Sequence, residues 1–108
     1  MDVTLDLKPS NAERVRLGAE KKARLLKSCR DLMAAGSFRP TSSEIAGKGG
    51  EHDIVNRFGS ISILYEEALD DSAVVRITAK VMNGGMGELT VRQMHRIARA
   101  VVFGRLST

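Results

Sequence analysis

The chain has 108 residues, of which 17 are Lys or Arg and 13 are Asp or Glu, giving a net charge of +4 at pH 7. This length allows one small domain, and 43% hydrophobic with 28% charged residues is the balance of a folded protein rather than a disordered one. Only 4% of the residues are aromatic, so we expect an aliphatic core. The single cysteine, Cys29, excludes an intrachain disulfide framework and a cysteine-rich zinc site.

Two features of the sequence bear on its location. No apolar run approaches the ~18 residues that a transmembrane helix needs. The first residues also lack the basic and apolar regions of a signal peptide. We therefore expect a cytoplasmic protein without a membrane partner. The mildly basic charge is compatible with nucleic-acid binding without proving it.

Residues 1–9 are predicted to form an N-terminal arm, and a long helix is predicted to follow it. Ser10 and Glu13 have the spacing of a capping box, which marks a helix start. Gly36 follows two alanines and is a typical helix end. Apolar residues at helical spacing between them predict one buried stripe, made of Val15, Ala19, Leu26, Cys29 and Met33.

Two short helices are predicted next. Thr41 and Glu44 form a second capping box, and the segment 47–50, with three glycines in four positions, ends the helix that this box opens. The following helix runs from about Glu51 to Phe58. At 100° per residue its side chains separate into a polar and an apolar arc. The polar arc holds His52, Asp53, Asn56 and Arg57, and the apolar arc holds Ile54, Val55 and Phe58.

The remaining residues, 61–108, are predicted to form two or three further helices. Residues 61–69 are amphipathic, and Asp70 has the position of a new helix cap. Residues 73–82 are ambiguous because they are rich in strand-forming side chains that partly alternate. We predict a helix there, since no partner strand is evident. Thr90 and Gln93 form a third capping box before the last helix.

The block 10–60, a long helix followed by two short ones around a glycine-rich turn, predicts a helix-turn-helix domain. The polar arc of its third helix carries side chains suited to DNA. An asparagine can bond adenine at two points, and an arginine can bond guanine or hold a phosphate. The predicted DNA-binding residues are Thr41, Ser42, Lys48, His52, Asn56 and Arg57.

Residues 20–70 resemble the TetR family of bacterial transcription regulators. The similarity lies in the segment 24–36, in Phe38 with Thr41, in residues 44–46 and above all in residues 57–65, Arg-Phe-Gly-Ser-Ile-Ser-Ile-Leu-Tyr. The resemblance implies an all-α regulator, expected to be a repressor, that binds duplex DNA as a dimer. The chain differs from the family pattern at Asp53, at Val55 with Asn56 and at Ile61, and its C-terminal part is short.

The last helix is predicted to supply both core and dimer surface, because its apolar arc is broader than one small neighbour needs. The residues assigned to the interface are Met94, Ile97, Val101 and Val102. A two-fold dimer would place two recognition helices about 34–36 Å apart. Arg92, Arg96 and Arg99 form a separate row that we interpret as a solvated face.

Other functions are less well supported by the sequence. A helical dimerisation or protein-interaction module with a degenerate helix-turn-helix that does not bind DNA is the alternative. No enzyme motif, cofactor motif or metal-ligand spacing is present, and Cys29 lies on the apolar stripe as a small core residue. A small-molecule effector is not expected either, because the short segments 61–83 and 88–104 offer little room for a pocket.

Overall fold

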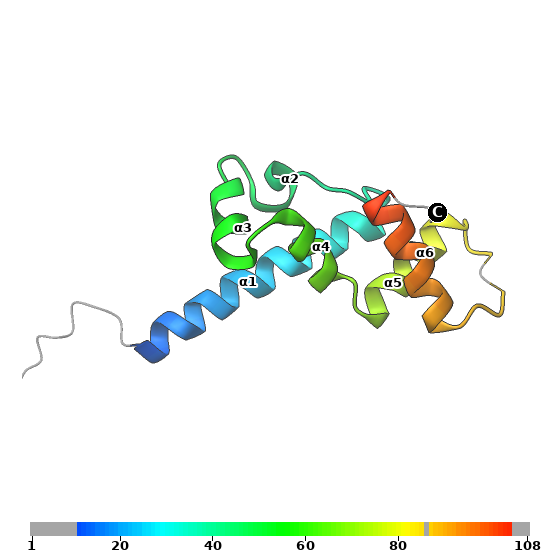
Figure 1. Ribbon diagram of the computed structural model, residues 1–108, viewed down its shortest axis with the longest axis horizontal. Coiled ribbons are helices and arrows are strands. Elements are labelled where there is room, and N and C mark those ends of the chain that lie inside the picture. The colour runs from blue at the N-terminus through cyan, green and yellow to red at the C-terminus, as the bar shows by residue number, and fades with distance from the viewer. Residues whose placement is uncertain (1–10, 86, 105–108) are drawn as a thin grey trace, which may run out of the picture.

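The computed structural model describes residues 11–85 and 87–104, and in this part of the chain every regular element is a helix. The predicted all-α fold is therefore confirmed, including the helix over the ambiguous residues 73–82. The predicted arm 1–9 and the Ser10 cap lie outside the described residues. The helices, shown in Figure 1, are α1 (Asn11–Ala34), α2 (Ser42–Ala46), α3 (Glu51–Phe58), α4 (Ile61–Ala68), α5 (Asp71–Val81) and α6 (Val91–Phe103).

Side-chain caps set the starts of three helices at the predicted residues. At α2 the Thr41 hydroxyl accepts the Glu44 amide at 3.1 Å, and the Glu44 carboxylate accepts the Thr41 amide at 2.8 Å. Thr90 and Gln93 make the same reciprocal pair at the start of α6. The Asp70 carboxylate accepts the Ala73 amide at 2.8 Å and starts α5. Each cap satisfies amides that have no partner within the helix.

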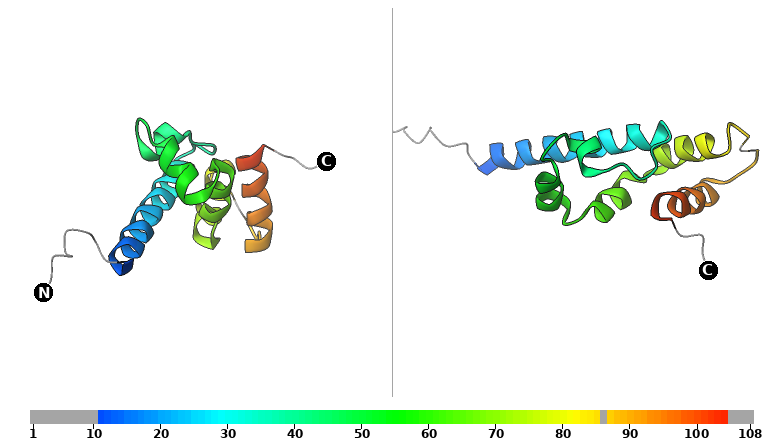
Figure 2. Two further views of the ribbon diagram at one scale, coloured as in Figure 1. Left: turned by 60° about the vertical axis from the view of Figure 1, so that its left-hand side comes forward. Right: turned by 90° about the horizontal axis from the view of Figure 1, so that it is seen from above.

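Helix α1 is the longest helix of the described residues, and four of the other helices pack against it. The short helices α2, α3 and α4 contact it, α5 packs beside its C-terminal half, and α6 packs on α5 (Figures 1 and 2). The first turns of α1 extend past the other helices (Figure 1). Val15, predicted on the buried stripe, is accordingly 72% exposed, and Ala19 is exposed as well. The stripe prediction is wrong at this end because no helix covers it.

None of the helices in the described part combines the length and apolar character needed to cross a membrane.

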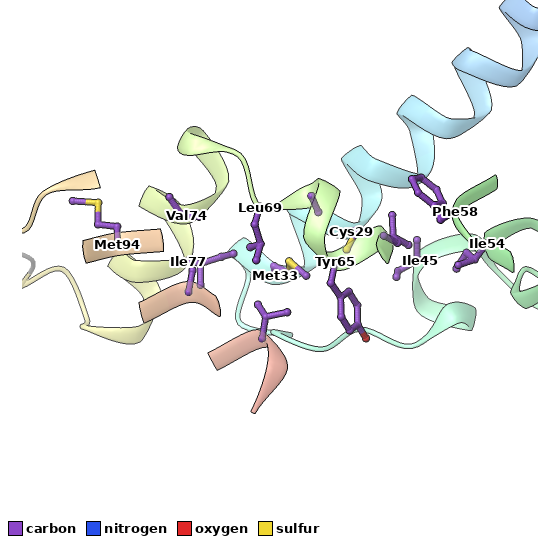
Figure 3. Packing of buried hydrophobic residues seen from close by; sticks show 14 residues of the cluster. Cys29, Met33, Ile45, Ile54, Phe58, Tyr65, Leu69, Val74, Ile77 and Met94 are labelled. Carbon is purple, nitrogen blue, oxygen red and sulfur yellow. The ribbon is translucent and has the colours of Figure 1, made fainter. Parts of the chain in front are cut away.

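The core is aliphatic and runs through all six helices (Figure 3). Its polar atoms are paired, as buried polar atoms generally are. The Tyr65 hydroxyl donates to the Pro40 carbonyl at 2.7 Å, and the Thr78 hydroxyl donates to the Met94 carbonyl at 3.4 Å. The fully buried side chains include Cys29, Met33, Ile54, Leu64, Val74, Ile77 and Val102.

Two glycines shape the turn between α2 and α3. Gly47 ends α2 with a φ of +86°, a backbone conformation that a side chain disfavours. Gly50 has an ordinary φ of −73° but lies directly against α2. A β-carbon there would overlap the β-carbon of Ala46 and lie 3.0 Å from the Gly47 carbonyl oxygen. The close approach of the two helices therefore depends on the missing side chain.

We expect Gly50→Ala to lower the free energy of unfolding by about 1–3 kcal/mol, the usual cost of overpacking. Urea unfolding followed by circular dichroism measures this change. Gly85→Ala is the control, because its added carbon would meet only the Met82 carbonyl oxygen at an ordinary 3.6 Å. Equal unfolding midpoints for the two variants would contradict the close packing of α2 on α3.

Candidate nucleic-acid interface

Helix α3 presents one polar face to solvent, as the sequence predicts. Ile54 and Phe58 are buried beneath it (Figure 3), and His52, Asp53 and Asn56 are exposed. The prediction is wrong for Val55, which was assigned to the apolar arc but is 51% exposed. Two apolar residues are enough to cover the contacts of this short helix, and Val55 lies on the outer edge of that arc. The exposed face therefore carries a valine among its polar side chains.

Arg57 does not share the exposed face with Asn56. It is partly buried at the edge of α3 nearest α1, where a β-carbon on Gly18 would lie 3.6 Å from its Nη1 atom. The prediction that the two residues share one exposed arc is therefore wrong for Arg57. Arg57 follows Asn56 by about 100° around the helix, and this step brings it to the side that faces α1, whereas the equal step from Val55 to Asn56 stays on the exposed side.

Arg57 lines a groove of about 380 Å³ between α1, α2 and α3. Its cationic rim is formed by Lys21, Arg24 and Arg57, with Asp53 beside them. Leu25, Ile45 and Ala46 contribute apolar surface, and the Ser28 hydroxyl in the wall donates to the Ile45 carbonyl at 2.9 Å. Lys21 and Arg24 were not among the predicted DNA-binding residues. Their spacing of three residues places them on one side of α1, but only the packing of α3 shows which side this is.

The cations of α1 divide by the helix that they face. Lys22 pairs with Glu67 at 3.5 Å, and its Nζ lies 5.2 Å from the centre of the Phe58 ring. Arg30 pairs with Asp70, and its guanidinium also donates to the carbonyls of residues 67 and 68. Within the described part of the chain, none of the three cations of the groove, Lys21, Arg24 and Arg57, makes an ion pair. The groove thus collects three cations that make no ion pair in the described residues, with Asp53 as the carboxylate that lines it beside them.

The other predicted DNA-binding residues lie outside this groove. Thr41 is exposed, but its hydroxyl is engaged in the α2 cap. Ser42 is the first residue of α2 and is partly exposed, and Lys48 is exposed in the glycine turn. These residues belong to the α2 side of the molecule, whereas His52 and Asn56 are exposed on α3. The structure therefore offers two adjoining polar surfaces rather than one cluster.

The predicted dimer residues of α6 have a different role in part. Met94 and Val102 are buried against the core of their own chain, so they offer no area to a second copy in this arrangement. Ile97 and Val101 are partly exposed. Met94 and Val102 are buried because α5 covers one side of the broad apolar arc of α6. Only Ile97 and Val101 are left as candidate contacts of the predicted set.

The arginine row of α6 is exposed, and one of its members is paired with α4. Arg99 makes two hydrogen bonds to Glu66 of α4, at 2.5 and 2.7 Å, and these bonds lower the pKa of the Glu66 carboxyl. Arg92 and Arg96 are exposed, and no ion pair involves them in the described residues. Arg99 is exposed as well, so the row lies on a solvated face, and the sequence did not predict the pairing of Arg99 with the Glu66 carboxylate.

No metal or nucleophile site accompanies the groove in the described residues. No group of three or more His, Cys, Asp or Glu side chains comes together there, and neither His52 nor His95 belongs to such a group. Cys29 is completely buried, and burial raises the pKa of its thiol from 9.0 to about 12. A thiol of this kind is protonated at neutral pH and acts as a small core side chain.

Comparisons with known proteins add no family to these observations. Searches with protein-family models, among curated proteins and among solved structures find no match to this chain. The resemblance of residues 20–70 to TetR regulators therefore stays a prediction from the sequence. The structure itself offers an exposed, largely polar helix beside a groove lined by three cations that make no ion pair in the described residues.

Proposed function

We propose that the protein is a transcriptional regulator that binds duplex DNA, with α3 in the major groove and the surrounding cations on the phosphates. The observation that carries this proposal is the groove lined by Lys21, Arg24 and Arg57, three cations against one carboxylate, Asp53, with no ion pair among them in the described residues. Unpaired cations gathered beside an exposed helix are the electrostatic pattern expected of a nucleic-acid surface. A buried or paired set of cations would not attract an anionic polymer in this way.

We propose different tasks for the exposed residues of α3 and for the cations around it. Asn56 is exposed on α3 and can bond the edge of an adenine in the major groove. Arg57 lies at the flank of the helix, beside Lys21 and Arg24, where a phosphate is the suitable ligand. Lys48, exposed in the glycine turn, can add a further phosphate contact. Phosphate contacts of this kind fix the orientation of a protein, while base contacts select the sequence.

Fluorescence anisotropy with a labelled random-sequence duplex, measured at several salt concentrations, tests the proposal. Four phosphate contacts per chain predict a slope of about −3 to −4 for log affinity against log salt, since each released counterion contributes about −0.9. Affinity that is absent, or that does not change with salt, would overturn DNA binding. Self-association in sedimentation experiments without DNA binding would instead support the alternative of a protein-interaction module.

Asp53 opposes phosphate binding in this arrangement, because its carboxylate lines the same groove as the three cations. We expect Asp53→Asn to raise the affinity for random duplex DNA by about threefold to tenfold near 0.1 M salt. The same anisotropy titration measures it. Glu88→Gln removes an equal charge from an exposed residue in the connection between α5 and α6, two helices that lie at the other end of the molecule from α3 (Figure 1). An equal gain in both variants would show that net charge, rather than the groove, determines affinity.

A further inference from the structure

The exposed face of α3 carries one apolar side chain, Val55. It is 51% exposed, and the exposed residues His52 and Asn56 lie on the same side of the helix. At about 100° per residue, all three side chains fall within an arc of roughly 100°. The face that would enter the major groove therefore presents methyl groups as well as polar groups.

Neither helix stability nor core packing accounts for a valine at this position. Ile54 and Phe58 already fill the contacts of α3 with the core, at 1% and 6% exposure. A β-branched side chain also lowers helix propensity, because its first torsion angle is restricted. A polar residue or alanine would serve the helix better at an exposed site. Other half-exposed apolar side chains occur in the described residues, among them Val81 and Val91, but Val55 lies on the same exposed face as His52 and Asn56, where its methyl groups are available for an apolar contact outside the chain.

Duplex DNA offers one apolar group on the edges of its bases in the major groove, the 5-methyl of thymine. On the basis of the proposed function, we infer that Val55 contacts this methyl group and that Asn56 bonds an adenine at a neighbouring base pair. The protein then selects DNA with A·T pairs under α3. The cations of the groove hold the phosphates but do not distinguish one base from another.

Thymine and deoxyuridine differ only in the 5-methyl group, so their exchange tests the contact directly. The full chain first selects duplexes from a random library, and each thymine of the selected site is then replaced by deoxyuridine. We expect one replacement to weaken binding by about threefold to fivefold, the effect of one methyl removed from an apolar contact. Val55→Ala should bind both duplexes equally, whereas Asn56→Ala should keep the preference for thymine at the Val55 position.

The control variant is Val55→Thr, which keeps one γ-methyl and should retain part of the preference for thymine. Since Val55 is half exposed, neither variant is expected to disturb the core, and circular dichroism checks this. Site-specific binding without any difference between thymine and deoxyuridine would overturn the inference but leave DNA binding intact. A difference that persists in Val55→Ala would also overturn it. Failure to bind any duplex in a salt-dependent way would overturn the proposed function as well.

Discussion

Replacing Lys21, Arg24 and Arg57 together by alanine is expected to weaken duplex binding by about two to three orders of magnitude near 0.1 M salt. Each side chain would lose one phosphate contact, and each contact contributes about 0.9 to the salt slope, so the slope should become shallower by roughly 2.7. All three residues line the groove and make no ion pair in the described part of the chain, so their removal should not leave a buried charge behind. Anisotropy titrations at several salt concentrations measure both quantities.

A matched triple variant separates the groove from the overall charge. Lys80, Arg92 and Arg96 are exposed on α5 and α6, away from α3 (Figure 1), and their replacement by alanine removes the same charge. We expect a loss of less than about tenfold for this control, since distant exposed charges are screened by salt. Similar losses for the two triple variants would place the phosphate contacts elsewhere. Thermal unfolding of both proteins confirms that they remain folded.

Helix positions are the part of this fold that local sequence predicts best. The capping boxes at Thr41 and Thr90 and the cap at Asp70 mark three helix starts within a residue of the observed ones. These signals work because a cap bonds amides only two or three positions away. The information needed is therefore contained in a few neighbouring residues. The same locality explains why the glycine turn after α2 was predicted.

The helix over residues 73–82 shows where local patterns become ambiguous. Its valines and its isoleucine fit a strand equally well, and only the absence of a partner strand favoured a helix. In the structure Val74 and Ile77 are both fully buried in α5, which packs between α1 and α6 (Figure 3). Three positions apart, they share one side of a helix, whereas in a strand they would point to opposite faces.

Contacts between distant helices determine the features that the sequence did not predict. Nothing in the local sequence distinguishes Arg30 from the other cations of α1, yet its guanidinium donates to the last two carbonyls of α4. Arg99 likewise meets Glu66, which is 33 positions earlier in the chain. The groove lined by Lys21 and Arg24 also depends on contacts between helices that are far apart in the sequence. Helical periodicity in the sequence shows that a side chain lies outside the apolar stripe of its helix. It does not show which residue of another helix that side chain contacts.

A second large effect is expected in the core. Ile77 is completely buried in α5, in the layer that joins α1 to α6 (Figure 3). We expect Ile77→Ala to lower the free energy of unfolding by about 2–5 kcal/mol, the sum of lost burial and the remaining cavity. For a domain of this size, with about 5–15 kcal/mol in total, this is a substantial share of the stability. Urea unfolding followed by circular dichroism measures the change.

Val81→Ala is the matched control for this core variant, because Val81 lies one turn further along the same helix and is 40% exposed. Exposed substitutions of this kind usually change stability by less than about 0.5 kcal/mol. The Ile77 variant should still unfold in one transition, because α5 packs against α1, and α3 and α4 pack against that same helix. The slope of its unfolding free energy against urea concentration should also be unchanged. A loss as small as that of the control would mean that the α5–α6 pair contributes little to the core. A separate early transition would show that α5 and α6 unfold independently of the helices that form the groove.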